Sequence, residues 1–197
     1  MGFDDLRWNL EGHFKNIINL LRHESDICTD DRHLDDTPRR LAEAFAYDYF
    51  SGLWKNPDDI FNKGVFQQAV DDNVDQMILL KNIDFVSLCV HHFLPFVGHV
   101  HVAYLPNQKL VGLSKIPRIV EVLSRRPQVQ ERLTQQLADC LVKNLVPFGC
   151  GVVIDAEHQC MACRGVRKSG IVTRTSALRG TFLDQKVKQE FFMGISG

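Results

Sequence analysis

Two clusters of cysteine and histidine stand far apart in this chain, at Cys89-Val90-His91-His92 and at His158-Gln159-Cys160. Cysteine sulfur and histidine nitrogen are ligands that zinc takes readily, and three such ligands leave a fourth position open for water, as in a catalytic site. Cys89 and His92 are three residues apart, so they can meet at one metal only where the chain turns or starts a helix. A single Cys-x-x-His is common by chance, so from spacing alone the catalytic metal site is one hypothesis among several.

Residues 151–162 read as a strand, and side chains two apart on a strand point to the same face. We therefore expect His158 and Cys160 to lie side by side, one on the metal and the other beside a substrate. His91 is expected next to the metal without binding it. An alternative uses Cys163 as a fourth ligand, which gives a closed structural zinc site. A strand continuing through residue 163 would place Cys160 and Cys163 on opposite faces, which favours the three-ligand site.

Basic side chains near these clusters point to an anionic ligand. Lys115 and Arg118 are one helical turn apart and follow Ser114 at an expected helix N-terminus, where backbone N–H groups favour anions. Arg164 follows the second cluster directly, and Arg40 lies in an expected helix nearer the start of the chain. Singly, each is typical of a solvated surface charge. Together they favour an anionic substrate without specifying it.

A polar pair, Gln130-Glu131, lies in the helical pattern of residues 128–145. A carboxylate can accept two parallel hydrogen bonds, such as those from the N1–H and the exocyclic amine of guanine. The same position is typical of an exposed helix glutamate, so this pair alone does not identify a ligand.

The composition is that of an ordinary globular chain. Of the 197 residues 45% are hydrophobic and 24% charged, with a net charge of -1. A core can therefore form without disulfides, and a general nucleic-acid binder, which is usually basic, is disfavoured. No signal-peptide pattern opens the chain, and no segment approaches the ~20 apolar residues of a membrane span. We expect a cytoplasmic protein, in which reduced thiols near histidines indicate metal or catalysis.

Hydrophobic periodicity predicts the elements that must position these side chains. Helices are expected over 6–22 and from Thr37-Pro38, within an N-terminal helical segment 1–75. A catalytic domain is expected over 76–197, in the order strand, strand, helix, helix, strand, strand, followed by a short helix. The strands are expected at 77–90, 99–106, 151–162 and 171–182, and the helices at 114–124 and 128–145. The order predicts an α+β fold with an antiparallel sheet covered on one face.

Three stretches of the sequence resemble the GTP cyclohydrolase I family. They are SLCVHHFLPFVGHVHVAYLPNQKLVGLSKIPRIVEVLSRRPQVQERLTQQ, IDAEHQCMACRGVRKSG and TSALRGTF, and the similarity extends over about residues 12–195. The resemblance implies the tunnelling fold and a homodecamer of two face-to-face pentamers, with active sites between subunits. It also implies a zinc enzyme that hydrolyses GTP to 7,8-dihydroneopterin triphosphate and formate.

The resemblance implies a role for each residue singled out above. The implied zinc ligands are Cys89, His92 and Cys160. The implied acid–base residues are His91 and His158, with Ser114 near the ribose. The implied substrate-binding residues are Gln130 and Glu131 for guanine, and Lys115, Arg118, Arg164 and, more weakly, Arg40 for the triphosphate. Histidine suits proton transfer here because it gains and loses protons near neutral pH.

One position departs from the family pattern. Where the family commonly reads Cys-Glu-His-His, this chain has Val90 in place of the glutamate. Valine cannot hydrogen-bond, so any contact that this carboxylate makes around the metal is absent or supplied elsewhere. The departure concerns the tuning of His91 and the metal more than the ligand set.

Two other functions stay open at this point. One is a related tunnelling-fold enzyme acting on another purine- or pterin-like substrate, which would need the triphosphate-binding residues less. The other is a non-catalytic zinc protein that uses Cys163. The downstream route of the product, whether folate, biopterin or deazapurine, is not encoded in these motifs.

Overall fold

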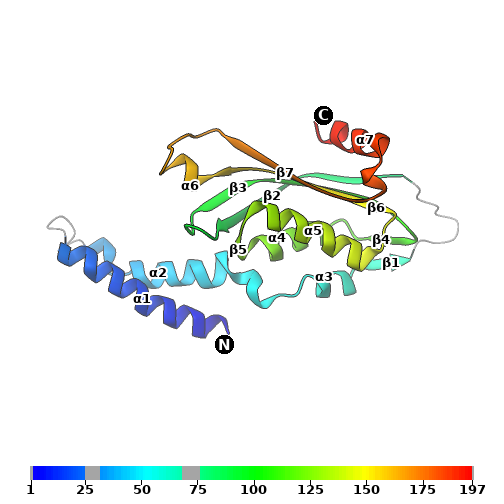
Figure 1. The fold of residues 1–197 in the computed structure, drawn as a ribbon. Coiled ribbons are helices and arrows are strands. Elements are labelled where there is room, and N and C mark those ends of the chain that lie inside the picture. The colour runs from blue at the N-terminus through cyan, green and yellow to red at the C-terminus, as the bar shows by residue number, and fades with distance from the viewer. Residues whose placement is uncertain (1, 25–31, 68–75, 197) are drawn as a thin grey trace. The chain divides into compact units, whose positions relative to one another are not determined.

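The computed structural model describes residues 2–24, 32–67 and 76–196 (Figure 1). Two compact units divide the chain, Met1–Trp54 and Lys55–Gly197. The sequence predicted an N-terminal segment 1–75 and a catalytic domain 76–197. That functional division stays a prediction, because the two compact units are defined by packing alone. Within the described ranges, no helix combines the length and apolar character that a membrane crossing needs.

The N-terminal unit is helical, as predicted. Its elements are α1 (Phe3–Glu24), η1 (Arg32–Leu34), α2 (Thr37–Glu43), the π-helical η2 (Ala44–Tyr49) and η3 (Ser51–Trp54). Phe14 of α1 packs on Phe45, with ring centroids 5.4 Å apart. Asp36 rather than Thr37 is the N-cap of α2, and Pro38 lies in the first turn, where its missing N–H costs no hydrogen bond.

A five-stranded sheet forms the centre of the second unit, in the order β5-β2-β3-β6-β7. Its strands are β2 (Ile78–Cys89), β3 (Pro95–Leu105), β5 (Pro127–Gln128), β6 (Gly149–His158) and β7 (Val172–Gly180). All neighbours pair antiparallel except β5, which runs parallel to β2. A second, two-stranded sheet pairs β1 (Val65–Gln67) with β4 (Lys109–Val111).

Helices cover both faces of this sheet, though unequally. The helical elements of this unit are α3 (Asp58–Asn62), α4 (Lys115–Ser124), α5 (Gln130–Leu145), α6 (Gln159–Ala162), η4 (Thr181–Leu183) and α7 (Gln185–Ser196). Helices α4 and α5 lie on one face, and α7 lies on the other (Figure 1). The predicted α+β class and strand–strand–helix–helix–strand–strand order are confirmed. The main helical cover lies on one face as expected, and α7 adds a smaller cover on the other face that was not predicted.

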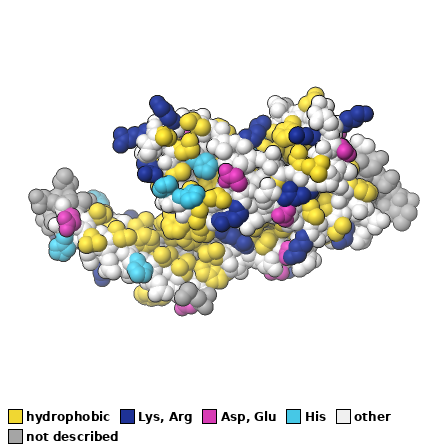
Figure 2. Space-filling model, viewed as in Figure 1, with side chains coloured by type: hydrophobic (Ala, Val, Ile, Leu, Met, Phe, Trp, Pro, Cys, Tyr) yellow, Lys and Arg dark blue, Asp and Glu magenta, His cyan; other side chains and the backbone are white. Residues whose placement is uncertain are grey.

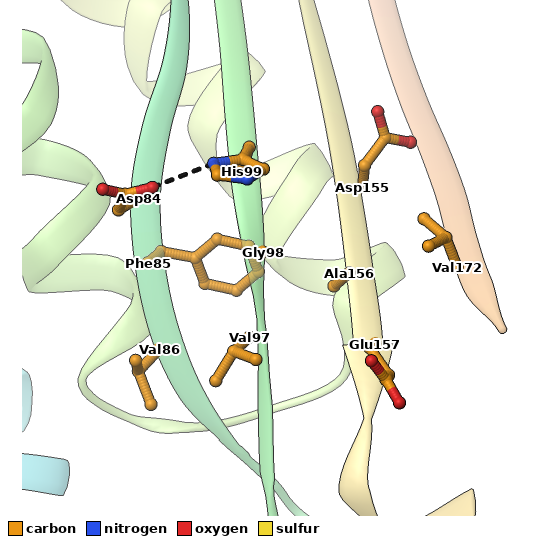
Figure 3. A pocket seen from close by; sticks show the side chains of 10 residues that line it. All are labelled: Asp84, Phe85, Val86, Val97, Gly98, His99, Asp155, Ala156, Glu157 and Val172. Carbon is orange, nitrogen blue, oxygen red and sulfur yellow. Dashed lines mark ion pairs between the residues drawn. The ribbon is translucent and has the colours of Figure 1, made fainter. Parts of the chain in front are cut away.

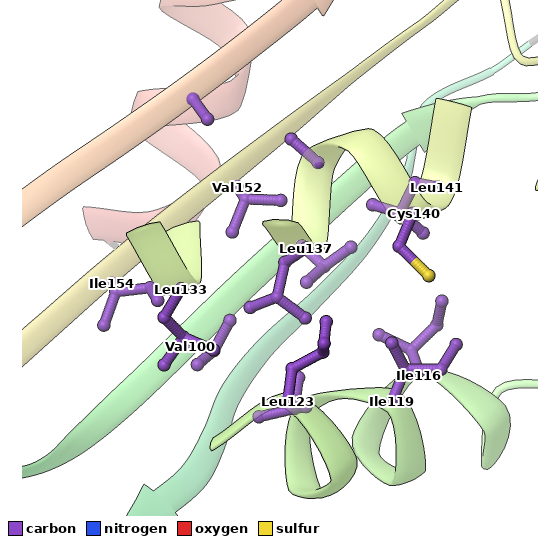
Figure 4. Packing of buried hydrophobic residues seen from close by; sticks show 14 of the residues in the cluster. Val100, Ile116, Ile119, Leu123, Leu133, Leu137, Cys140, Leu141, Val152 and Ile154 are labelled. Atoms are coloured by element: carbon purple, nitrogen blue, oxygen red, sulfur yellow. The ribbon is translucent and has the colours of Figure 1, made fainter. Parts of the chain in front are cut away.

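The main core fills the space between the sheet and helices α4 and α5 (Figure 4). Leu133, Leu137 and Leu141 recur at helical spacing on α5 and are almost fully buried against Val152 and Ile154 of β6. A smaller cluster on the opposite face packs α7 and η4 on the sheet. The leucine period that predicted α5 is therefore the side of the helix that faces the sheet.

The strand predicted over 151–162 is wrong in its second part, because β6 ends at His158 and α6 follows. At this point β6 loses its pairing partners on both sides. The last β3 pair is Phe96 with His158, and the last β7 pair is Glu157 with Val172. Unpaired strand backbone has no partner for its N–H and C=O groups, so the chain turns into a helix instead.

Gly98 allows β3 and β6 to approach closely. A Cβ atom built on Gly98 would lie 1.9 Å from the carbonyl oxygen of Asp155. A backbone atom cannot move aside as the end of a side chain can, so the two strands would have to separate.

We therefore expect Gly98→Ala to lower the free energy of unfolding by about 3 kcal/mol, the upper end of overpacking costs. Gly112→Ala is the matched control, because its Cβ would meet atoms only at 3.8 Å, and a change within about 0.5 kcal/mol is expected. Urea unfolding at one protein concentration measures both variants. Equal stability of the two variants would contradict this account of the β3–β6 contact.

Candidate metal centre and active site

A tight turn follows β2 and folds His92 back over Cys89. The backbone N–H groups of His92 and Phe93 both donate to the Cys89 carbonyl, at 3.3 and 2.8 Å, and the Cys89 N–H donates to the Leu94 carbonyl at 2.9 Å. Phe93 has a φ of 50°, a left-handed conformation that is uncommon for a bulky residue. The turn that the Cys89–His92 spacing required is therefore present.

The turn brings Cys89 and His92 to Cys160. One ligand atom from each of the three residues lies within 4.8 Å of the other two. Cys89 is buried, Cys160 partly buried and His92 exposed, so the group opens to solvent on one side. Two thiol sulfurs and one imidazole nitrogen fit zinc, and three ligands leave a coordination position free.

Cys163 does not join this group among the described residues. It is exposed, and its thiol donates to the Gln159 carbonyl at 2.8 Å within α6. The strand argument that placed Cys160 and Cys163 on opposite faces is wrong, because both lie in or next to a helical turn. The three-residue group is supported instead by the positions of its ligand atoms.

The thiols of the chain differ in their surroundings. Burial raises the pKa of Cys140 to about 11 and that of Cys150 to about 12, so these two core thiols stay protonated and unreactive. The pKa of Cys160 is also raised, mainly by burial and to a smaller extent by the neighbouring Cys89 thiol. A bound cation reverses this balance, because it favours the thiolate.

His158, at the end of β6, lies between an aromatic ring and a buried amide. Its ring stacks on Phe96 with centroids 4.7 Å apart and planes at 1°. Its Nε2 lies 2.8 Å from Oε1 of Gln130. Burial lowers the pKa of His158, and the nearby Glu131 carboxylate partly offsets that effect.

Gln130 is only 1% exposed, and its amide group is fully engaged. The Nε2 of Gln130 donates to the carbonyls of Ile154 and Thr173, at 3.0 and 2.8 Å, and contacts Oγ1 of Thr175 at 3.1 Å. Rotating the amide by half a turn would set its oxygen against two carbonyl oxygens, so Oε1 must face His158. An amide oxygen only accepts. His158 therefore donates through Nε2 and keeps a free lone pair on Nδ1 when neutral.

His91 lies beside the metal-ligand group. Its Nδ1 is 3.5 Å from Sγ of Cys89, and its ring centroid is 6.3 Å from that of His92. The side chain is exposed. Histidine side chains gather at the surface around α6 in the view of Figure 2. His91 can thus exchange protons with solvent or with a ligand above the cysteines.

The predicted anion-binding residues fall into separate places. Arg164, after α6, donates from Nη1 to Nε2 of His92 at 2.8 Å. Ser114 is the N-cap of α4, where Lys115 and the exposed Arg118 lie in the first turn. Arg40 lies on α2 in the other unit and pairs with Asp36 at 3.5 Å. Of these residues, the structure brings Arg164 into contact with the metal-ligand group.

A pocket of 490 Å³ opens elsewhere on the sheet, and none of its lining residues is a predicted site residue (Figure 3). Asp84 of β2 pairs with His99 of the neighbouring strand β3 at 2.9 Å, and Asp155 and Glu157 of β6 add two more carboxylates to the lining. Asp155 is paired with Arg174 through two hydrogen bonds of 2.7 Å, so its carboxylate is already engaged. The cysteine–histidine group, rather than this pocket, is the candidate site.

Phe96 is the site residue that the sequence analysis missed. The strand that carries it was expected to begin at residue 99, and β3 begins at Pro95. Its ring is fully buried, and periodicity does not distinguish an aromatic ring that stacks on a histidine from one that only fills the core.

Comparison with known proteins identifies the family. The sequence profile described as GTP cyclohydrolase I matches residues 10–196. The chain belongs to the GTP cyclohydrolase I family. Membership makes it an enzyme, and it confirms the resemblance seen in the motifs around Cys89 and Cys160.

Relatives of this family member are similar over most of their length. GTP cyclohydrolase 1 of Campylobacter jejuni (strain RM1221) is 49% identical over 157 residues, which is 79% of this chain and 80% of that protein. GTP cyclohydrolase 1 of Parabacteroides distasonis is 42% identical over 182 residues, or 92% and 89%. Among solved structures, the apo archaeosine synthase QueF-Like matches 53% of this chain and 93% of that chain, with 16% identity and a TM-score of 0.44.

The bonds of Gln130 predict that this family member loses stability when the amide is removed. We expect Gln130→Ala to lower the free energy of unfolding by about 1–3 kcal/mol, the usual cost of leaving buried carbonyl groups without a donor. Gln135→Ala, on the exposed side of the same helix, is the control, with a change within about 0.5 kcal/mol. Urea unfolding compares the two variants. Similar losses would show that the buried position of Gln130 does not matter.

Proposed function

We propose that this enzyme is a zinc-dependent GTP cyclohydrolase I, which hydrolyses GTP to 7,8-dihydroneopterin triphosphate and formate. The observation that carries the proposal is the convergence of Cys89, His92 and Cys160 beside His91 in a chain of this family. When bound, zinc supplies Lewis-acid chemistry that activates water near neutral pH.

His158 is the proposed acid for N7 of the purine. Because Gln130 holds its Nε2–H, His158 exchanges protons at Nδ1, and the Phe96 stack keeps the ring in one plane. Burial lowers its pKa, which makes the protonated ring a readier proton donor. Gln130 is thus a positioning residue for His158, and because its buried amide is engaged by protein groups, the predicted guanine contact falls to Glu131 rather than to the Gln130 side chain.

His91 is the proposed donor to the ribose ring oxygen. Its exposed ring is supported for this task by its place next to Cys89, beside the ligand group but outside it. Ser114, at the start of α4, is proposed to lie near the ribose. Opening of the sugar then needs a proton at an oxygen that His158, engaged with the base, does not serve.

Substrate contacts complete the proposal. Glu131 accepts the two N–H groups of the guanine edge, which its exposed position in the first turn of α5 allows. The proposed triphosphate ligands are Lys115, Arg118 and Arg164, with Arg40 contributed by the N-terminal segment. We further propose a cytoplasmic homodecamer of two pentamers, active sites between subunits, and residues 76–197 as the catalytic tunnelling-fold domain.

Formate release tests the function together with the ligand set. Zinc-replete protein given GTP is expected to release formate, and guanosine is expected to be a poor substrate because it lacks the triphosphate. Cys160→Ala is expected to lose bound zinc and formate release together, whereas Cys163→Ser keeps both. Zinc content by atomic absorption and a formate assay measure the outcome. Loss of zinc from Cys163→Ser as well as from Cys160→Ala would indicate the closed structural site instead.

His158→Ala separates metal binding from proton transfer. It is expected to keep stoichiometric zinc and to lower the turnover number by about 10²–10⁴, the usual contribution of a general acid. The zinc content and turnover of the purified variant check this. Full turnover would remove His158 from the mechanism while leaving the metal centre in place.

A further inference from the structure

The contact between Arg164 and His92 places a cation on a proposed metal ligand. Nη1 of Arg164 lies 2.8 Å from Nε2 of His92. A guanidinium has only donors, so Nε2 of His92 is the acceptor. In a neutral imidazole one nitrogen carries the lone pair and the other the proton, so Nδ1 of His92 is protonated in this state.

Neither nitrogen of His92 can then bind a metal while this hydrogen bond exists. Nε2 has a single lone pair, which the guanidinium already occupies. Binding through Nδ1 requires the ring proton to move to Nε2, and an N–H at Nε2 would face the N–H of Arg164. The hydrogen bond from Arg164 therefore blocks metal binding at either ring nitrogen of His92.

We propose that Arg164 caps His92, so that metal binding and the Arg164–His92 hydrogen bond exclude each other. This inference rests on the metal site proposed above. Loading the metal releases the guanidinium, which becomes available to a phosphate or another anion. If bound metal raises the affinity of Arg164 for an anion by some factor, then by linkage that bound anion raises the metal affinity by the same factor.

The side chain of Arg164 can move without its backbone. The chain after α6 is held by backbone bonds from the Arg167 N–H to the Arg164 carbonyl, at 3.2 Å, and from the Lys168 N–H to the Met161 carbonyl, at 3.0 Å. The Arg164 side chain itself is exposed. Rotation of an exposed side chain is enough to uncap His92, so the exchange costs little more than one hydrogen bond.

Zinc affinity tests the cap without reference to turnover. Wild-type protein and Arg164→Ala compete for zinc with a chromophoric chelator at pH 7.5. Arg164→Ala is expected to bind zinc about three- to tenfold more tightly, the size of one net hydrogen bond. Lys168→Ala is the matched control, because it removes the same charge from the same segment and its side chain makes no described contact with His92. Its affinity is expected to change less than about twofold, since exposed charges are screened.

Each outcome decides the proposal. Unchanged affinity in Arg164→Ala, with one zinc bound per wild-type chain, overturns the cap and leaves the metal site intact. An equal gain in Arg164→Ala and Lys168→Ala overturns it too, because loss of positive charge would then account for the effect. Absence of zinc binding in wild-type protein overturns both the metal site and the cap.

The linkage to anions has its own test. Sulfate, a weak zinc ligand, replaces chloride at constant ionic strength in the same competition. It is expected to tighten zinc binding by wild-type protein and to leave Arg164→Ala unchanged. An equal response of the two proteins, or none in wild type, overturns the coupling between the anion and the metal.

Discussion

The buried amide of Gln130 joins the fold to the chemistry. On one side it donates to carbonyls of β6 and β7, which ties the first turn of α5 to two strands. On the other side it accepts from His158. Its orientation is decided by the sheet, and the tautomer of His158 is decided by its orientation. Because the amide cannot be turned without opposing carbonyl oxygens, the tautomer of His158 follows from strand pairing.

Strand direction explains why the two sequence clusters meet. β2 and β6 both pair antiparallel with β3, so they run parallel to each other and their C-terminal ends lie at the same end of the sheet. Cys89 ends β2 and His158 ends β6. Beyond these residues the chain leaves the extended form, in a turn on one side and in α6 on the other. These two departures carry His92 and Cys160 toward the same point.

Residue types and periodicity predicted the main elements and the three residues that converge at the candidate metal centre. Part of the reasoning that led to this centre was wrong. The alternation of β6 was extended through Cys160, because nothing in the local pattern shows where neighbouring strands stop. Strand ends depend on partners distant in sequence, here Phe96 and Val172. The role of Gln130 was equally hidden, since its position on α5 is buried only by the strands beneath it. The chemical types of the candidate site residues could be recognised in the sequence, whereas the pairing register of the strands could not.

Val90 shows how the turn and the electrostatics of the site are separable. Its backbone N–H donates to the Gln128 carbonyl at 2.8 Å, so the chain is held here through the backbone, whatever the side chain. The apolar side chain contributes no acceptor where the family commonly has a carboxylate. The charged group in contact with His92 is instead the Arg164 cation. A positive group disfavours a second cation nearby, so under the proposed cap the metal affinity would depend on where that guanidinium is held. The turn is thus fixed by the backbone of Val90, whereas the charge that contacts His92 comes from Arg164.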